Sequence, residues 1–289
     1  MICRQCPRGC NIDRAVNLGY CQSPELPKIA RAGLHFWEEP CISGQNGSGT
    51  VFFSGCSLGC VFCQNEEISH KNYGKIVSIE RLSEIFRELE QKGAHNINLV
   101  NPTHYVHAIS EAVKLYRPNI PIVYNSGGYD TVETIDKASE FVDIFLMDMK
   151  YRSADRALKY SKAQDYPTVS EKAILRCAEV VKENTYDNKG IMQKGLIIRH
   201  LILPQGTRDA IEVIDWVDKN VPWAVLSLMS QYTPHGDLTE YKEINRKITQ
   251  REYDKVLDRA ADSGIENIFT QELNSSSSKF IPPFDLSGV

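Results

Sequence analysis

Short apolar runs rich in β-branched and aromatic residues recur along the chain from residue 50 onward. Runs of this kind, without a regular polar alternation, are typical of parallel strands that are buried on both faces of a sheet. We predict six such strands, at residues 51–53, 97–100, 120–124, 144–147, 196–203 and 224–228.

Segments with helical spacing lie between these runs. The clearest one begins after Ser78, which can cap a helix, and stops at Gly93, which can end one. Its apolar residues fall on one helical face: Ile79, Leu82, Ile85, Phe86 and Leu89. We predict further helices at residues 105–116, 131–141, 171–182, 207–217 and 251–261.

The alternation of strands and helices predicts an α/β protein. Right-handed crossovers between successive strands would curl the sheet into a partial (β/α)6 TIM-like barrel. In such a barrel, chemistry takes place at the carboxyl ends of the strands. Polar residues follow the predicted strands there: Asn101, Asn125, Asp148, Lys150 and Gln231. Each of them, taken alone, could be polar only because a strand end meets solvent.

Composition divides the chain into three parts. Residues 1–45, called the leader below, are poor in apolar periodicity and rich in cysteine, which predicts a small irregular segment organised by a metal. Residues 46–273 form the barrel. Residues 274–289 form a tail, in which we expect a flexible serine-rich link at 274–278 and an apolar patch at 280–284 that docks back.

Charge and hydropathy narrow the partners and the cellular location that we expect for the protein. A formal net charge of -4 argues against binding to a phosphate backbone, so nucleic acid is not an expected partner. No apolar run is long enough for a membrane span, and the first residues lack the layout of a signal peptide. We therefore expect a cytoplasmic protein, in which thiols stay reduced and clustered cysteines indicate metal ligands before disulfides.

Eight of the nine cysteines lie in the first 63 residues. Three of them, Cys56, Cys60 and Cys63, have the spacing C-x3-C-x2-C. A cubane cluster held by three thiolates keeps one of its irons open, and this openness permits catalysis. A zinc site would need a fourth ligand, and only His70 lies within ten residues after Cys63. The spacing therefore favours an iron–sulfur cluster.

The segment CSLGCVFC at residues 56–63, placed after a first strand, resembles the radical SAM superfamily. The stretches CVFCQN (60–65), FLMDMK (145–150) and RHLILP (199–204) resemble the pyruvate formate-lyase activating enzyme group. Relatives of that group share CPRGC at 6–10 and HFWEEPCISG at 35–44. The resemblance implies a [4Fe-4S] cluster on the three cysteines with S-adenosylmethionine (SAM) on the open iron. Reductive cleavage of SAM would give methionine and a 5'-deoxyadenosyl radical that abstracts hydrogen from a substrate.

The resemblance also implies contacts to SAM. Phe62 takes the position of an aromatic residue near adenine, with plain packing as the alternative. Asn125 and Ser126 occupy a turn that reads Asp-Thr-Asn-Gly in activating enzymes, and the missing Asp charge argues against a monovalent cation beside SAM. Asp148 and Arg199 match residues that hold the methionyl end, and a structural ion pair between them is an equal alternative.

One departure from the superfamily lies after the second predicted strand. A Gly-Gly-Glu motif is common there, whereas this chain has Asn101, Pro102, Thr103 and His104. Asn101 and Thr103 can still donate or accept hydrogen bonds at the ammonium group of SAM. His104 and His107 stand at a helix start, where they could be metal ligands, proton donors or ordinary surface histidines.

The leader holds a second group of cysteines. Cys3, Cys6, Cys10 and Cys21 supply four thiolates in a segment that has little apolar core, so we expect a second metal site. Zinc would hold the leader in place on the barrel, whereas an auxiliary iron–sulfur cluster would relay electrons or contact substrate. Unliganded thiols are the alternative. Cys41 is a fifth cysteine and leaves the ligand set open.

These patterns predict a radical SAM oxidoreductase, although they name no catalytic side chain. By resemblance, its substrate is a glycine of a partner glycyl radical enzyme, and its electron donor is a protein such as flavodoxin or ferredoxin. Radical modification of a peptide, metabolite or nucleic acid is a second hypothesis. A non-catalytic metal-binding or electron-transfer protein is a third. The segment at 35–39 could form a partner surface, but we expect Phe36 and Trp37 to pack the leader onto the barrel.

Overall fold

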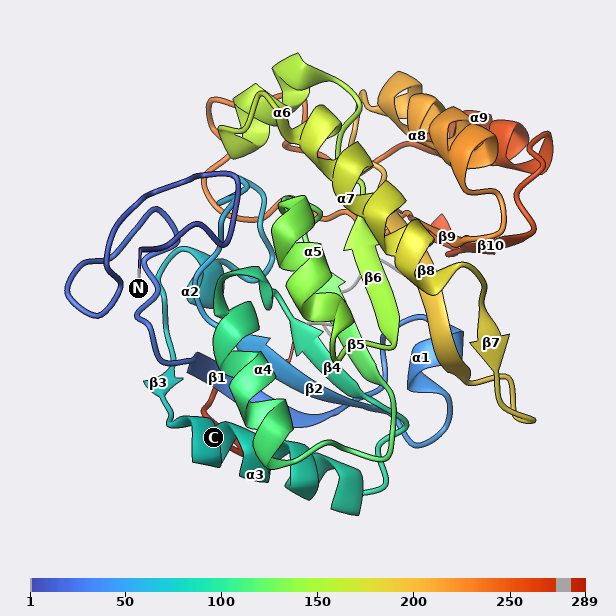
Figure 1. The fold of residues 1–289 in the computed structure, drawn as a ribbon. Coiled ribbons are helices and arrows are strands. Elements are labelled where there is room, and N and C mark those ends of the chain that lie inside the picture. Colours follow the sequence, from blue (N-terminus) through green and yellow to red (C-terminus); the bar gives the residue numbers. More distant parts are fainter. Residues whose placement is uncertain (1, 274–281) are drawn as a thin grey trace.

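The computed structural model describes residues 2–273 and 282–289 and contains one large curled sheet (Figure 1). Its strand order is β10-β9-β8-β6-β5-β4-β2-β1-β3. The parallel strands are β2 (Ser48–Phe53), β4 (Ile97–Val100), β5 (Ile122–Ser126), β6 (Ile144–Asp148), β8 (Met192–Leu201), β9 (Val225–Met229) and β10 (Asn267–Thr270). The antiparallel strands are β1 (Lys28–His35), β3 (Lys75–Ile76) and β7 (Thr185–Tyr186).

All six predicted strands are present, which confirms the α/β class and its mostly parallel sheet. β8 begins earlier than predicted, at Met192. β10 was not predicted because it is a short edge strand whose Ile268 and Phe269 are only half-buried. Apolar runs mark strands that are buried on both faces, and an edge strand lacks this mark.

Helices cover the outer face of the sheet (Figure 1). The long helices are α3 (Ile79–Gln91), α4 (Val106–Leu115), α5 (Val132–Ser139), α7 (Tyr166–Val181), α8 (Thr207–Asn220) and α9 (Gln250–Ala261). The short ones are α1 (Pro40–Ser43), α2 (Glu66–Ser69), η1 (Thr103–Tyr105) and α6 (Ala154–Ser161). As predicted, Ser78 caps α3, since its side chain accepts a hydrogen bond from the Arg81 N–H. No helix within the described ranges is long and apolar enough to cross a membrane.

The two faces of the sheet differ in chemistry. The outer face packs against the helices in one extended apolar core. The inner face is closed at its floor by α1, whose Cys41 and Ile42 pack on Val123, Leu146 and Ile197. Because side chains alternate along a strand, the polar residues between outward-facing core residues point inward. The inward-facing polar residues above the floor are Asn98, Asn125, Asp148, Arg199 and Ser227.

The leader is shorter in its irregular part than the sequence predicts. Residues 2–27 contain no long element, but β1 follows them as a regular strand of the sheet. β1 was overlooked because its sequence contains no continuous apolar run and half-buried positions stand among its buried ones. Residues 2–27 contribute no side chain to the apolar clusters of the described chain. They lie beside α2, at the carboxyl ends of the first strands (Figure 1).

The described part of the tail docks on β1. The Leu286 N–H donates to the Ala30 carbonyl at 3.0 Å, and the Ala32 N–H donates to the Ser287 carbonyl at 2.8 Å. Phe284 is buried and packs edge-on against Phe52, with 5.5 Å between ring centroids. The docking expected for the apolar patch is therefore present at Phe284. The expected serine-rich link lies outside the described residues.

Candidate functional site

The three cysteines of the C-x3-C-x2-C motif lie in a loop that leaves the carboxyl end of β2. The loop begins at Gly55, which has a φ of +86°, a conformation that favours glycine. A Cβ atom at this position would also collide with the Ser23 hydroxyl and the Cys21 carbonyl. Gly55 therefore allows the leader to pack directly on the start of the cysteine loop.

Each of the three thiol sulfurs accepts a hydrogen bond. The Leu58 N–H lies 3.3 Å from Cys56 Sγ, the Ser161 hydroxyl 2.9 Å from Cys60 Sγ, and the Ser69 hydroxyl 3.2 Å from Cys63 Sγ. Donors aimed at sulfur stabilise thiolates and tune iron–sulfur clusters. Burial raises the pKa of the Cys63 thiol to about 12, so its thiolate requires a compensating positive charge. A cationic iron cluster fits these requirements.

Within residues 2–273 and 282–289, no three His, Cys, Asp or Glu side chains converge on a single ion. A cubane cluster takes each thiolate on a different iron, so its three ligands need not converge on one point. Among the leader cysteines, Cys6 interacts electrostatically with Cys3, Cys10 and Cys21. Cys41 belongs to the barrel floor.

A buried charge network lies on the inner face of the barrel. Asp148, at the end of β6, accepts from Lys150 Nζ at 2.6 Å and from Arg199 Nε at 2.9 Å. Arg199 also donates to Asn125 Oδ1 at 2.6 Å and to Glu38 Oε2 at 3.3 Å. Burial opposes the ionisation of Asp148, but the two cations outweigh it and lower the pKa of its carboxyl. The ion pair between Asp148 and Arg199, which was one of the two alternatives in the sequence analysis, is thus present.

Two acidic residues of this network were missed by the sequence analysis. Glu38 pairs with Arg199, and Glu39 is buried with an Oε2 atom that has no hydrogen-bond partner among the described residues. Burial raises the pKa of both carboxyls. Their neighbours Phe36 and Trp37 were expected to pack the leader onto the barrel. Both are largely exposed, at 50% and 61%, although the Phe36 ring lies against Gly47. Adjacent glutamates carry no spacing signal that would have revealed them.

A second buried network engages Thr103 and Ser126. The Thr103 hydroxyl donates to Asp130 Oδ1 at 2.7 Å, the Tyr124 hydroxyl donates to the same atom at 2.8 Å, and the Ser126 hydroxyl donates to Asp130 Oδ2. Burial raises the pKa of Asp130. Asp130 was also missed, because a lone Asp after a Gly-Gly turn usually meets solvent. Both hydroxyls predicted to contact SAM are occupied by this carboxylate.

Asn101 and Phe62 border the cysteine loop from two sides. Asn101 has a φ of +59°, donates from its backbone N–H to the Asn125 carbonyl at 2.8 Å, and donates from Nδ2 to the Gly55 carbonyl. Phe62 is buried, with its ring 5.9 Å from that of Tyr232 and 6.3 Å from that of Tyr160. Asn101 thus supports the loop, and Phe62 packs against two tyrosine rings beside it.

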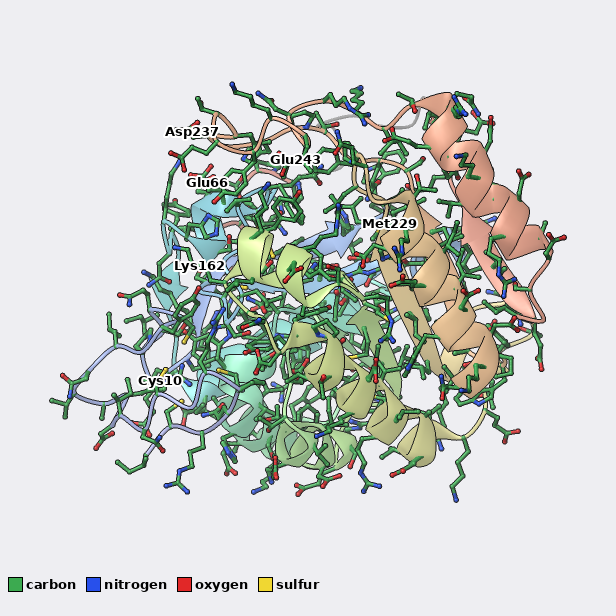
Figure 2. All side chains as sticks on the ribbon, turned by 90° about the horizontal axis from the view of Figure 1, so that it is seen from above. Cys10, Glu66, Lys162, Met229, Asp237 and Glu243 are labelled. Carbon is green, nitrogen blue, oxygen red and sulfur yellow. The ribbon has the colours of Figure 1, made fainter. Side chains whose placement is uncertain are left out.

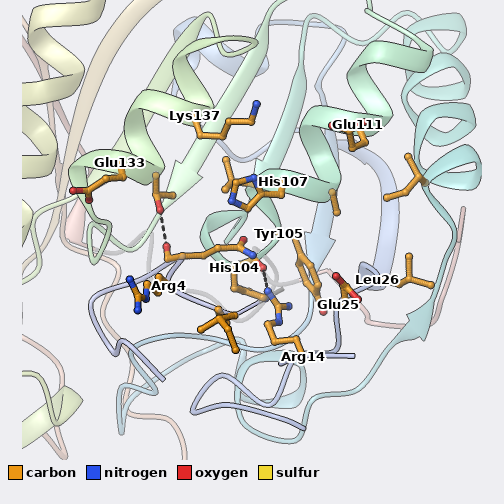
Figure 3. Close-up of a pocket in the computed structure, with 17 residues that line it drawn as sticks. Arg4, Arg14, Glu25, Leu26, His104, Tyr105, His107, Glu111, Glu133 and Lys137 are labelled. Carbon is orange, nitrogen blue, oxygen red and sulfur yellow. Dashed lines mark hydrogen bonds between the residues drawn. The ribbon is translucent and has the colours of Figure 1, made fainter. Parts of the chain in front are cut away.

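His104 and His107 lie beside the barrel mouth, and they differ from the expected surface pair. His104 is buried, and its Nε2 lies 2.8 Å from the Ser54 carbonyl, while its Nδ1 has no partner within the described chain. Only His107 is exposed. Both line a cavity of about 650 Å³ between the leader, α4 and α5 (Figure 3). Its charged lining mixes both signs, with Arg4 and Lys137 near Glu111 and Glu133 in Figure 3.

The fold and the site together define an α/β barrel protein with a cysteine loop at the carboxyl end of its first parallel strand. Residues 50–217 match the family model of the radical SAM superfamily. The match covers more than half of the chain, and the protein belongs to this superfamily. Membership implies a [4Fe-4S] cluster and SAM, which the sulfur environment described above fits.

The chain is also similar to a relative in sequence and to solved structures in fold. An uncharacterised protein of Methanocaldococcus jannaschii is 30% identical over 276 residues, which cover 92% of this chain and 76% of that protein. SuiB of Streptococcus suis bound to S-adenosylmethionine has a TM-score of 0.51 and 15% identity over 75% of this chain. SuiB bound to the precursor peptide SuiA has a TM-score of 0.50 and 15% identity over 75% of this chain. The matched region is 48% and 46% of those two SuiB chains, so the chain spans about half their length.

Proposed function

We propose that this radical SAM enzyme abstracts a hydrogen atom from a glycine of a partner protein and leaves a stored glycyl radical there. The proposal rests on the resemblance of residues 60–65, 145–150 and 199–204 to the pyruvate formate-lyase activating enzyme group. The structural observation that supports the SAM chemistry is the charge network beside the cysteine loop, whereas the glycine substrate rests on the resemblance. Lys150, which pairs with Asp148, also acts electrostatically on Cys60.

The residues proposed to hold the cluster are Cys56, Cys60 and Cys63, with Leu58, Ser161 and Ser69 as their hydrogen-bond donors. The methionyl end of SAM is a zwitterion, with one ammonium and one carboxylate. Arg199 and Lys150 offer cations to its carboxylate, and Asp148 and Glu38 offer anions to its ammonium. Because the methionyl end carries no net charge, its entry leaves the net charge of the network unchanged.

The cluster, when bound, supplies one-electron reductive cleavage of SAM. With both groups bound, one electron from a reductant such as flavodoxin or ferredoxin would break the sulfonium–carbon bond of SAM and release methionine. The 5'-deoxyadenosyl group would then accept a hydrogen atom from the glycine α-carbon, which would give 5'-deoxyadenosine and the glycyl radical. The proposed task of the chain is to orient SAM through Asp148, Lys150 and Arg199 and to exclude water from the radical.

The remaining predicted contacts stay proposals. Asn101 and Asn125 lie at the strand ends beside the loop and could place amide groups toward SAM. Phe62, Thr103 and Ser126 are also proposed to contact SAM, from positions where Phe62 packs on Tyr232 and the two hydroxyls donate to Asp130. The leader cysteines are proposed to hold a separate metal, either zinc or an auxiliary cluster.

The first test is SAM cleavage by anaerobically reconstituted protein with dithionite as reductant. We expect 5'-deoxyadenosine and methionine in equal amounts. The triple variant Cys56→Ala, Cys60→Ala, Cys63→Ala should form neither, and Cys41→Ala, outside both cysteine groups, should retain both. Intact cluster absorbance without 5'-deoxyadenosine would refute the enzymatic proposal and favour a metal-binding or electron-transfer role.

The second test concerns the substrate. Partner-protein fractions labelled with α-deuterated glycine should transfer deuterium to 5'-deoxyadenosine and show a glycyl radical in electron paramagnetic resonance spectra. Turnover that transfers no deuterium would overturn the glycine assignment. It would favour another site on a peptide or a metabolite.

A further inference from the structure

Tyr166 is a tyrosine whose hydroxyl joins two strand ends of the candidate site. It is the first residue of α7, and its side chain is fully buried. The hydroxyl oxygen accepts the Lys150 N–H at 2.9 Å. The hydroxyl also lies 2.9 Å from the Gly127 carbonyl and 2.8 Å from the Asp148 carbonyl, which share its one proton. The whole hydrogen-bonding capacity of this hydroxyl is therefore directed at backbone groups after β5 and at the end of β6.

The hydroxyl acts where the pairing of these two strands stops. The register of β5 and β6 ends at the pair Ser126 and Met147. Gly127 and Asp148 come directly after this last pair. Backbone groups beyond the end of a ladder need other partners when they are buried. The Tyr166 hydroxyl supplies one partner to both strands, so it extends the connection between them past the ladder.

The turn after β5 approaches the end of β6 so closely that only glycine fits. Gly128 has a φ of +79°, and a Cβ atom there would collide with the Asp148 carbonyl oxygen. A Cβ atom on Gly127 would lie 3.2 Å from Leu58 Cδ1 and 3.6 Å from Lys150 Cε. The turn thus lies between the cysteine loop and the Lys150 side chain, and small movements of it reach both.

The ring of Tyr166 is held in place by its neighbours. Tyr151 packs edge-on against it, with 5.4 Å between ring centroids, and Tyr129 stacks on it at 6.1 Å. The Tyr129 hydroxyl donates to Asp165 Oδ1 at 2.7 Å, directly before α7 begins. The same apolar cluster includes residues of the cysteine loop. A ring fixed in this way presents its hydroxyl at one position, which is what a positioning group requires.

The two β6 residues that Tyr166 contacts through their backbone carry charges of the network described above. Lys150 Nζ donates to Asp148 Oδ2 at 2.6 Å, and Asp148 Oδ1 accepts from Arg199 Nε at 2.9 Å. Because a side chain follows its backbone, a shift of residues 148–150 would move an anion and a cation together. The geometry of the network therefore depends on the hydroxyl that holds this backbone.

We propose that Tyr166 is a positioning residue for SAM binding, because its hydroxyl fixes the backbone of Asp148 and Lys150 against the turn at Gly127. This inference rests on the SAM contacts that are proposed above for Asp148 and Lys150. Loss of the hydroxyl alone leaves the Lys150 N–H without this acceptor and releases the two strand ends from each other. The apolar packing of the ring is retained. We therefore expect the loss to fall on SAM affinity.

Tyr166→Phe in the anaerobically reconstituted protein tests the proposal. Equilibrium dialysis should give a Kd for SAM that is raised about tenfold, the effect of one lost buried hydrogen bond. The KM for SAM should rise by a similar factor, while kcat falls by less than about threefold. A merely structural role would lower the folded fraction, which reduces the apparent kcat and leaves KM unchanged. Wild-type Kd and KM in Tyr166→Phe would overturn the proposal.

Tyr160→Phe is the matched control. It also removes the hydroxyl of a buried tyrosine in the same apolar cluster, but this hydroxyl donates to Glu243 Oε1 at 2.7 Å. In Figure 2, Glu243 lies near Asp237 in the segment between β9 and α9. The Kd for SAM should stay within about twofold of the wild-type value. An equal loss of affinity in both variants would assign the effect to the cluster as a whole and refute the special role of Tyr166.

Lys150→Met shows whether Tyr166 acts through the charge network, because this change removes the ammonium group and keeps the backbone. On this background, Tyr166→Phe should raise the Kd for SAM by less than about threefold, since residues that act as a unit have non-additive effects. The full tenfold effect on both backgrounds would mean that Tyr166 acts on SAM by another route, against the proposal.

Hydrogen exchange in the metal-free protein provides a measurement that needs neither cluster nor SAM. The amides of residues 148–150 should exchange about tenfold faster in Tyr166→Phe, whereas Tyr160→Phe should leave them unchanged. Unchanged exchange in Tyr166→Phe would show that the hydroxyl does not fix this backbone. The two proposals fail separately. A wild type that binds SAM without forming 5'-deoxyadenosine refutes the proposed reaction only, and a Tyr166→Phe variant with wild-type affinity refutes the role of Tyr166 only.

Discussion

Arg199 Nε lies 2.9 Å from Asp148 Oδ1, and this ion pair joins neighbouring strands β8 and β6 on the inner face of the barrel. Both side chains are largely buried, with exposed side-chain fractions of 16% and 13%. Such an ion pair can stabilise the fold, bind SAM, or do both. Substitution of one residue of the pair, or of both, separates these roles.

Asp148→Asn should destabilise the protein by about 3 kcal/mol, because it leaves Arg199 and Lys150 buried without their main anion. The double variant Asp148→Asn, Arg199→Gln should recover part of this loss, since both ends of the pair are then neutral. We expect neither variant to bind SAM at wild-type affinity. Urea unfolding and anaerobic equilibrium dialysis with SAM measure the two quantities. Wild-type SAM affinity in the double variant would make the pair purely structural.

We predict that the protein loses stability in acid because His104 is buried in its neutral form. Burial, helped by the Arg14 charge, lowers the pKa of His104 to about 3. The His104 side chain is protonated more easily in the unfolded chain, where its pKa is about 6.5. Its contribution to the free energy of unfolding is therefore fully present above pH 6.5. This contribution declines as the pH falls toward 3, by up to about 1.4 kcal/mol per pH unit.

Urea unfolding of His104→Gln and the wild type between pH 4 and pH 7 measures this effect. The free energy of unfolding of the variant should depend less steeply on pH across this range. His107→Gln, at an exposed position of the same cavity, is the comparison variant: burial also lowers the pKa of His107, but this side chain is less buried, so its change should flatten the slope less. Equal slopes for His104→Gln and the wild type would contradict the prediction.

Gly55→Ala tests the packing of the leader on the cysteine loop. Gly55 and Gly93 have similar φ angles of +86° and +81°, but of the two only Gly55 has described neighbours within 4 Å of where a Cβ atom would lie. Both changes should cost about 1 kcal/mol for the left-handed backbone. Gly55→Ala should cost more in unfolding free energy and should also lower the iron content per chain. Equal losses in the two variants would show that leader packing at Gly55 is unimportant.

Phe284→Ala should lower the free energy of unfolding by about 3 kcal/mol, the lower end for a buried aromatic residue. Its ring packs with Phe52 and Ile68 where the tail meets the barrel. Phe36→Ala removes a half-exposed ring and should change the free energy by about 0.5 kcal/mol at most. Thermal and urea unfolding of both variants provide the comparison. A neutral Phe284→Ala would mean that the tail contributes no stability.

The sequence predicted the parts of the fold that have strong local patterns. β4 is found at Ile97–Val100 as predicted, and α3 has the expected cap at Ser78. β1 and β10 were missed, since neither strand contains a continuous apolar run. Element boundaries are set by tertiary hydrogen bonds that no local pattern records.

The candidate site divides in the same way. The spacing of the three loop cysteines is a local signal, and the structure adds a donor to each sulfur. Glu38, Asp130 and Tyr166 could not be found from sequence, because each acts on residues far away along the chain. Tyr166, for example, contacts Gly127, which is 39 positions away. Only the fold brings such partners together.

The docked tail has a consequence for the behaviour of the protein at high concentration. Residues 282–289 occupy the backbone groups of Ala30 and Ala32 on the outer side of β1, next to the short β3. An uncovered strand edge is a template on which a second sheet can grow. Removal of residues 282–289 would expose this template, so the tail protects the barrel against edge-to-edge aggregation.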